Sequence, residues 1–175
     1  MLRYVRCKAP CYDLPMNRWL PLIALLVVLA VIAAVVVPPI YRGMLFTRDC
    51  RGLITAAKAG DIKQMAAACD PGQQQRVENL FTDLLPADFK DYIKTLKLTS
   101  WERQQDGTVL AVLTLRTEYN GAAGVYQGRL LWVYDGVARR WHWDFNRTEA
   151  AEFSLSGEPD WQPLATMLEL ARRYR

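Results

Sequence analysis

The sequence predicts an α+β protein in which an N-terminal transmembrane helix precedes helices packed on a curved, four-stranded antiparallel sheet, with a further helix at the C-terminus. Three observations predict this fold. One long uncharged run lies near the N-terminus, apolar residues then recur at helical spacing to about residue 96, and from there they alternate. The predicted parts are a tail over residues 1–18, a transmembrane helix over 19–41, an α+β domain over 42–153, and a polar loop with an amphipathic helix over 154–175.

The apolar run covers residues 20–37, which are eighteen residues without a charge. At about 1.5 Å per residue, a helix of this length reaches about 27 Å, close to the hydrocarbon thickness of a bilayer. Trp19 and Tyr41 stand near its two ends, where amphipathic aromatic side chains favour membrane interfaces. Pro38 and Pro39 follow the run, and we expect them to end the helix.

A cleaved signal peptide is the alternative to an uncleaved anchor. Signal peptides have an apolar region of about 7–15 residues before a small-x-small cleavage site, whereas this run is longer and continues into Val-Val-Val-Pro-Pro. The tail carries four basic residues and one acid, which favours a cytoplasmic tail. We therefore expect a single-pass protein of the bacterial inner membrane with its C-terminal domain in the periplasm.

The charge of the predicted outer domain is nearly balanced. Residues 42–175 hold 18 basic and 17 acidic residues, although the whole chain has a net charge of +4. A basic field that attracts nucleic acid is therefore not expected. The expected partners are the membrane and either a second copy of the chain or other subunits of a membrane complex.

The stretch after the anchor predicts an antiparallel pair of helices. Leu53, Ile54 and Ala57 form the apolar stripe of the first helix. Gly60 suits the left-handed position that ends a helix, and Asp61 is a good N-cap for the second helix, which is expected to continue to Cys69.

The four cysteines divide between the two sides of the membrane. Cys50 lies ten residues before Gly60 and Cys69 nine residues after it, so two antiparallel helices would place them at the same height. This predicts a Cys50–Cys69 disulfide, and the alternative is two small core residues that face apart. Cys7 and Cys11 lie in the tail, where free thiols are expected rather than lipidated thiols or zinc ligands. No metal site or cofactor is expected.

Two more helical segments precede the change of spacing. The first places four apolar side chains on one face: Val77, Leu80, Phe81 and Leu84. The second is shorter and carries Phe89, Tyr92, Ile93 and Leu96.

Four strands are predicted next, over residues 96–104, 109–119, 124–134 and 139–145. The turn signals between them are Asp106-Gly107, Asn120-Gly121 and Asp135-Gly136. Consecutive hairpins make an antiparallel meander. A last helix is expected from about Asp160, after a polar loop.

The fourth strand, R-R-W-H-W-D-F, holds the only histidine of the chain. Residues two apart share a face, so Trp141, Trp143 and Phe145 predict a buried face. His142 and Asp144 fall on the opposite face, where we expect solvent or an interface. The sequence identifies no nucleophile for them, and it contains no G-x-S-x-G or H-E-x-x-H motif and no phosphate-binding glycine loop, so no catalytic residue is expected.

An apolar centre with a charged border is predicted on that opposite face. Such patches are typical of association surfaces. The alternative is that the C-terminal helix covers the patch. The candidate interface residues are Leu110, Val112, Arg116, Leu131, Val133, Arg140, His142 and Asp144.

The helical A-A-K-A-G-D-I and the final hairpin W-V-Y-D-G-V-A-R-R-W-H-W-D-F resemble the nuclear-transport-factor-2-like (cystatin-like) superfamily over about residues 46–146. The resemblance implies a sheet wrapped around helices as a cone, and its enzyme branches place an acid or a histidine with tyrosine inside. Here His142 and Asp144 would lie outside the cone. The resemblance implies a candidate pocket inside it, lined by Tyr119, Tyr126, Trp132, Trp141 and Trp143.

A short tail, one anchor and an outer domain are also similar, in layout alone, to the inner-membrane component of type IV secretion systems. Two functions are therefore expected. The first is a non-enzymatic scaffold or assembly subunit of a bacterial envelope complex. The alternative is a binder of a small, lipid-like apolar ligand, or an enzyme, that uses the aromatic cone.

Overall fold

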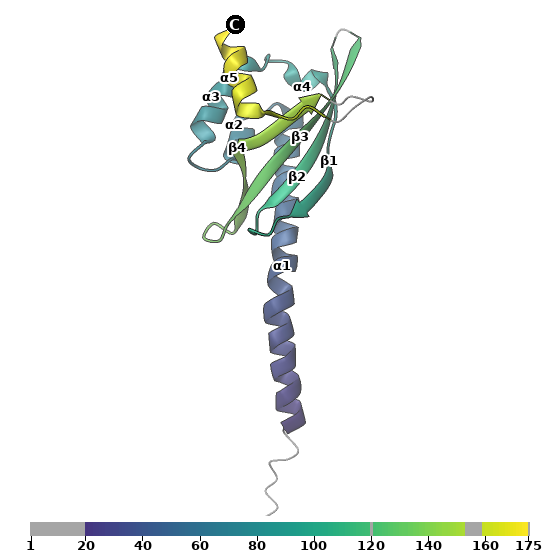
Figure 1. Cartoon of the computed structure of the whole chain (residues 1–175), viewed down its shortest axis with the longest axis vertical. Coiled ribbons are helices and arrows are strands. Elements are labelled where there is room, and N and C mark those ends of the chain that lie inside the picture. The colour runs from purple at the N-terminus through teal and green to yellow at the C-terminus, as the bar shows by residue number, and fades with distance from the viewer. Residues whose placement is uncertain (1–19, 120, 153–158, 175) are drawn as a thin grey trace, which may run out of the picture. The chain divides into compact units, whose positions relative to one another are not determined.

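The computed structural model describes residues 20–119, 121–152 and 159–174 (Figure 1). It has an α+β architecture with a long apolar N-terminal helix, an antiparallel sheet and a C-terminal helix, as predicted. The chain divides into two compact units, Met1–Arg42 and Gly43–Arg175. The predictions for the tail, including Cys7 and Cys11, fall outside the described residues.

Helix α1 spans Leu20–Ala59, so its last part belongs to the second unit. By length and composition it could cross a membrane, a test that signal sequences near an N-terminus also pass. The prediction that Pro38 and Pro39 end the helix is wrong, because both lie within it. Each proline removes one N–H donor from the helix, but the helical conformation continues through both residues to Ala59.

Three short helices follow, α2 (Ile62–Ala67), α3 (Gln74–Leu84) and α4 (Phe89–Tyr92). Gly60 has a φ of 74°, and the Asp61 carboxylate accepts the Gln64 N–H at 2.9 Å, so α1 ends and α2 begins as the sequence predicts. α2 ends before Cys69, and the segment expected to be helical to Leu96 turns into strand at Ile93. Pairing with the neighbouring strand overrides the local helical spacing there.

The sheet has five antiparallel strands in the order β1-β2-β3-β4-β5. The predicted meander is confirmed, but a fifth strand joins the four that were expected. The bounds are β1 Ile93–Arg103, β2 Val109–Tyr119, β3 Ala122–Asp135, β4 Arg140–Glu152 and β5 Gln162–Pro163.

Strand β4 continues seven residues beyond its predicted end at Phe145. Its register against β3 shifts between the pairs Leu131–Asp144 and Arg129–Glu149, so the apolar alternation is lost in between. The Thr148 hydroxyl donates to the Asp144 carbonyl at 2.9 Å within this irregular stretch. The sequence therefore underestimates the strand.

Helix α5 spans Leu164–Arg173 and begins later than expected, because Gln162 and Pro163 pair with β4 as β5. α5 packs beside α3 rather than over the far side of the sheet. Ion pairs join Arg172 to Asp83 at 2.7 Å and Arg76 to Glu169, and Ala165 is buried in the core.

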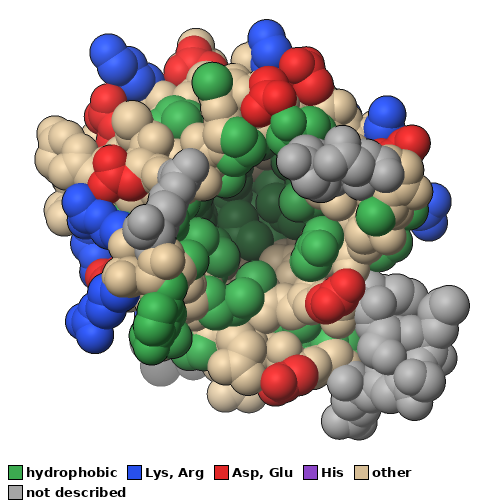
Figure 2. All heavy atoms as spheres, turned by 90° about the horizontal axis from the view of Figure 1, so that it is seen from above, with side chains coloured by type: hydrophobic (Ala, Val, Ile, Leu, Met, Phe, Trp, Pro, Cys, Tyr) green, Lys and Arg blue, Asp and Glu red, His purple; other side chains and the backbone are tan. Residues whose placement is uncertain are grey.

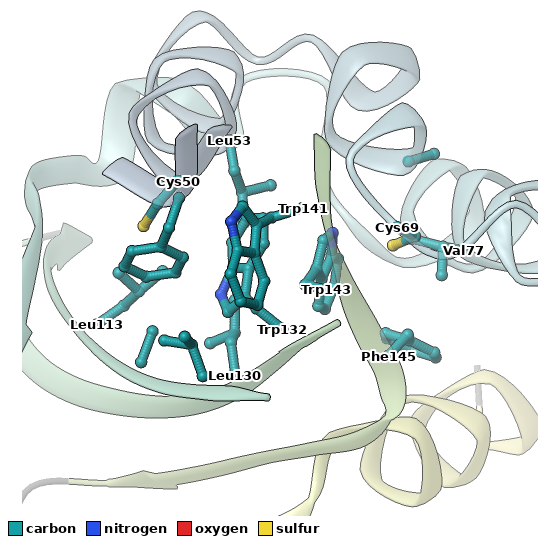
Figure 3. Close-up of a cluster of buried hydrophobic side chains, with 14 of the residues drawn as sticks. Cys50, Leu53, Cys69, Val77, Leu113, Leu130, Trp132, Trp141, Trp143 and Phe145 are labelled. Carbon is teal, nitrogen blue, oxygen red and sulfur yellow. The ribbon is translucent and has the colours of Figure 1, made fainter. Parts of the chain in front are cut away.

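The core lies between the helices and one face of the sheet, which we call the inner face; the other is the outer face. The last part of α1 and helix α3 supply its helical side, and Figure 3 shows their side chains against the tryptophans of β3 and β4. The inner-face residues of the core are Val109, Ala111, Leu113, Leu130, Trp132, Trp141, Trp143 and Phe145.

The first half of β4 would be a sheet edge, but the chain before α3 covers it. The Trp143 N–H donates to the Ala68 carbonyl at 3.0 Å, and the Asp70 N–H donates to the Trp143 carbonyl at 3.1 Å. The backbone N–H of Trp141 donates to the Asp49 carboxylate of α1 at 2.8 Å. Backbone groups that an edge strand would leave open are thus satisfied within the unit.

The predicted Cys50–Cys69 disulfide is wrong. Both thiols are free and buried, and Figure 3 shows them on opposite sides of the tryptophan cluster. The prediction assumed two helices of equal length, whereas α2 stops at Ala67 and Cys69 bridges to Trp143 of the sheet. The alternative of two core residues that face apart is the correct one.

Candidate functional site

Residues that pair across the strands form rows on the inner face, and the rows at its two ends differ. At the end where β2 begins, Val109 pairs with Trp132, and Trp132 pairs with Trp143. Phe46 of α1 makes an edge contact with Trp132, with ring centroids 5.7 Å apart. Val109, Trp132, Trp143 and Phe46 are all buried, so this end is filled. We call it the filled end.

The next row but one carries much smaller side chains. Leu113 pairs with Gly128, and Gly128 pairs with Ala150. A Cβ atom at Gly128 would meet only the tip of the Leu130 side chain at 3.2 Å and the Glu149 carbonyl at 3.8 Å. The small side chains of this row therefore fill less of the space over the inner face than the large side chains of the filled end do.

The Tyr126 ring does not fill that space, because it lies over Gly124 instead. A Cβ atom at Gly124 would come within 2.8 Å of this ring. Tyr126 pairs with Leu115 and with Glu152, so a phenol and a carboxylate lie in the row beyond Gly128. We call this end of the inner face, where β2 ends and β3 begins, the open end.

A hollow opens at this end of the second unit. Figure 2, the view from above in Figure 1, shows hydrophobic side chains around it and charged ones farther out. Several apolar side chains packed against the core remain only partly buried, which is consistent with an unfilled interior. They include Leu96 and Leu98 of β1, Met65 of α2, Leu84 of α3, and Leu164 and Leu168 of α5.

The residues predicted to line a pocket divide between the two ends. Trp132, Trp141 and Trp143 are buried at the filled end and are part of the hydrophobic core. Tyr126 is 40% exposed at the open end. The side chain of Tyr119 lies outside the described part of the chain, although its backbone ends β2.

His142 is buried, which corrects the expectation of a solvent-facing or interface-facing side chain. The chain before α3, which covers this edge of β4, also covers the imidazole, and Nδ1 lies 3.1 Å from the Cys69 carbonyl. Nδ1 also lies 3.3 Å from the Arg140 guanidinium, and Nε2 lies 4.0 Å from the Asp135 carboxylate. The imidazole thus contacts a backbone carbonyl rather than a nucleophile.

Neither buried thiol is suited to nucleophilic chemistry. Burial raises the pKa of the Cys50 thiol to about 11, and burial with the nearby Asp70 carboxylate raises the pKa of Cys69 further. Thiolates are the reactive form, so both groups are inert near neutral pH. Within the described residues, no three His, Cys, Asp or Glu side chains lie close enough to hold a metal ion.

The predicted interface residues on the outer face do not form one exposed patch. Leu131 and His142 are buried, and Asp144 accepts the Gln73 side-chain amide at 2.8 Å. The Arg140 guanidinium donates to the Ala67 carbonyl at 2.6 Å.

A smaller apolar group remains accessible on the outer face. Val133 is 41% exposed, Leu110 and Val112 are partly buried, and Arg116 is exposed beside them.

A scan against protein-family models and searches of curated proteins and of solved structures found no match to this chain. Sequence reasoning missed the open end, although two glycines four positions apart on one face of β3, Gly124 and Gly128, are a signal of a special backbone environment in a strand.

Proposed function

We propose that the protein is a single-pass membrane protein whose second unit is a non-enzymatic binding module, and that its hollow takes up a small apolar ligand. The observation that carries this proposal is the hollow at the open end, surrounded by hydrophobic side chains (Figure 2), where the small residues Gly128 and Ala150 pair on the inner face. Apolar ligands are held in preformed cavities of this kind, with few polar groups to fix their orientation. The Tyr126 hydroxyl and the Glu152 carboxylate are the polar groups in the neighbouring row.

The ligand proposal is tested by filling the space. Gly128→Leu adds a side chain on the inner face, and Gly136→Leu adds the same side chain in a turn where a Cβ atom would meet nothing within 4 Å. The full-length chain is purified in a lipid-free amphipathic polymer, and its bound small molecules are identified by native mass spectrometry. We expect a ligand on the wild type and on Gly136→Leu, and its loss from Gly128→Leu. Equal retention by all three chains, or no ligand on any, contradicts the proposal.

The proposed anchor and its orientation are tested with thiol labelling. Cys50 and Cys69 are buried, so the folded chain should offer only the tail thiols, Cys7 and Cys11, to a membrane-impermeant maleimide. A cytoplasmic tail predicts no label on intact bacterial spheroplasts and two labels after permeabilisation. Two labels before permeabilisation would mean that the tail faces the periplasm. No label in either state means that the tail has been removed with a cleaved signal peptide.

A second candidate function is an assembly subunit of an envelope complex in the bacterial inner membrane. The accessible apolar group of Leu110, Val112 and Val133 on the outer face favours it. Crosslinking in native membranes, followed by mass spectrometry, would recover stoichiometric partners. Val112→Glu should abolish those crosslinks, whereas Ala123→Glu, on the same face but exposed at the other end, should not. Unchanged crosslinks in Val112→Glu contradict this function.

A further inference from the structure

A groove of about 380 Å³ lies on the second unit, apart from the hollow, where three elements meet. The last part of α1, the region of α2 and the start of β4 each contribute a wall. Its floor is open because small residues lie there, and a Cβ atom at Gly52 would meet nothing within 4 Å. The lining residues are Arg48, Asp49, Gly52, Leu53, Gln64, Ala67, Ala68, Arg140 and Trp141.

The charged side chains of the groove leave a net positive charge. Asp49 is its one acid, and both of its oxygens are engaged: Oδ1 by the Arg48 guanidinium at 2.8 Å and Oδ2 by the Trp141 N–H at 2.8 Å. Asp49 is therefore neutralised within the protein. Arg140 remains as the second cation, with Asp135 close enough to interact with it electrostatically.

Arg140 is held in place before any ligand arrives. One of its terminal nitrogens, Nη2, donates to the Ala67 carbonyl at 2.6 Å and lies 3.3 Å from Nδ1 of His142. A guanidinium has five N–H donors, so donors remain on Arg140 and on Arg48. Arginine donors held in fixed positions suit the oxygens of a phosphate or a carboxylate. The Gln64 amide adds a donor, and Leu53 and Trp141 add apolar surface.

We propose that this groove binds the phosphate headgroup of an anionic phospholipid, an inference that rests on the proposed membrane anchor. Arg48 is the seventh residue after Tyr41, which ends the proposed anchor. Even a fully extended chain of that length spans only about 25 Å, so Arg48 lies no farther than this from the end of the proposed anchor. Phospholipid combines an anionic group with an apolar body, and Lys or Arg side chains near a membrane surface are attracted to anionic headgroups.

The test titrates the purified full-length chain in a neutral detergent with phosphatidylglycerol and counts bound lipids by native mass spectrometry. Arg48→Gln with Arg140→Gln removes both cations, and we expect the Kd for phosphatidylglycerol to rise roughly tenfold or more. Gly52→Glu places a carboxylate in the groove without displacing any packed atom and should weaken binding as well. The Gly52→Glu variant still tests the groove if Arg140→Gln disturbs the fold. The charge-matched control, Arg103→Gln with Arg173→Gln, changes two exposed arginines outside the groove and should bind like the wild type.

Two results would overturn the proposal. The first is equal affinity of the wild type and both groove variants for phosphatidylglycerol. The second is displacement of the lipid by inorganic phosphate at matched concentration, which would assign the groove to a solution anion. The anchor is tested separately by alkaline extraction of vesicles that contain the same chains. If alkali removes the chain from the vesicles while the groove variants still bind phosphatidylglycerol more weakly than the wild type, only the proposed anchor is contradicted.

Discussion

The two ends of the inner face are built from the same three strands but have different contents. At the filled end, the row of Val109, Trp132 and Trp143 meets Phe46 of α1, and all four are buried. At the open end, the row of Leu113, Gly128 and Ala150 has much smaller side chains, and Figure 2 shows a hollow at this end. The aromatic packing of the unit is therefore concentrated at the filled end, whereas the open end leaves the space in which we propose that the ligand binds.

This division explains how a small unit can keep a cavity. Large aromatic side chains bury more apolar surface than any others, and their contacts are concentrated around Trp132 and Trp141, both of which Phe46 touches. Side chains that line a hollow lack van der Waals contacts on the side that faces it. Substitutions at the two ends should therefore differ in the size, and even in the sign, of their effect on the free energy of unfolding.

The largest effect is expected from Trp132→Ala. The side chain is fully buried among aromatic rings, so its loss should lower the free energy of unfolding by about 3–5 kcal/mol. Trp132→Phe should cost much less, because the indole N–H has no hydrogen-bond partner among the described residues and phenylalanine removes that unmet donor. Urea unfolding of the full-length chain, followed by far-UV circular dichroism, measures both. Equal losses in the two variants would mean that Trp132 does not pack as described.

A smaller effect is expected from Asp49→Ala, which removes the side chain that joins α1 to the edge of β4. The Trp141 N–H would lose its acceptor, at a cost of about 1–3 kcal/mol. Asp49→Asn keeps an oxygen at this place and should restore most of the loss. Arg48→Ala, at an exposed neighbour, is the control and should change the free energy of unfolding by less than about 0.5 kcal/mol. If Arg48→Ala lowers the free energy of unfolding as much as Asp49→Ala does, the effect comes from the Arg48–Asp49 ion pair instead.

A pH effect is expected from the buried thiols. The pKa of Cys50 rises from 9.0 to about 11 in the folded chain, so between these values the unfolded chain loses its proton first. The free energy of unfolding should therefore fall as the pH rises from about 9 to about 11. Cys50→Ala with Cys69→Ala should flatten this slope, as measured by urea unfolding at several pH values. An unchanged slope in the double variant would place the titrating group elsewhere.

Much of the fold follows from local patterns, and the corrections come from contacts between distant residues. The alternation of Trp141, Trp143 and Phe145 predicts a buried face because a strand repeats every two residues, and the structure confirms it. The Cys50–Cys69 pairing failed because the length of α2 is limited by the backbone pairing of Cys69 with Trp143. Only the folded sheet creates that pairing.

The site was harder to predict for the same reason. Gly128 and Ala150 become neighbours only through the register shift of β4, which local spacing does not reveal. The predicted pocket used the tryptophans, whose size makes them fill a core as readily as line a cavity. Likewise, His142 alternates like an outward-facing residue, but the segment before α3 buries it.

The smallest effect on stability is expected from Gly128→Leu, and it is the sharpest test of the comparison between the two ends. Glycine within a strand costs about 0.5–1 kcal/mol through its backbone freedom, and leucine removes that cost. Its Cβ atom would press on the flexible tip of Leu130 at 3.2 Å and would make an ordinary contact with the Glu149 carbonyl at 3.8 Å. We therefore expect the free energy of unfolding to stay within about 1 kcal/mol of the wild type or to rise, while the apolar ligand is lost. A loss of more than about 2 kcal/mol would mean that the open end is packed as tightly as the filled end, and the hollow could not then serve as a binding site.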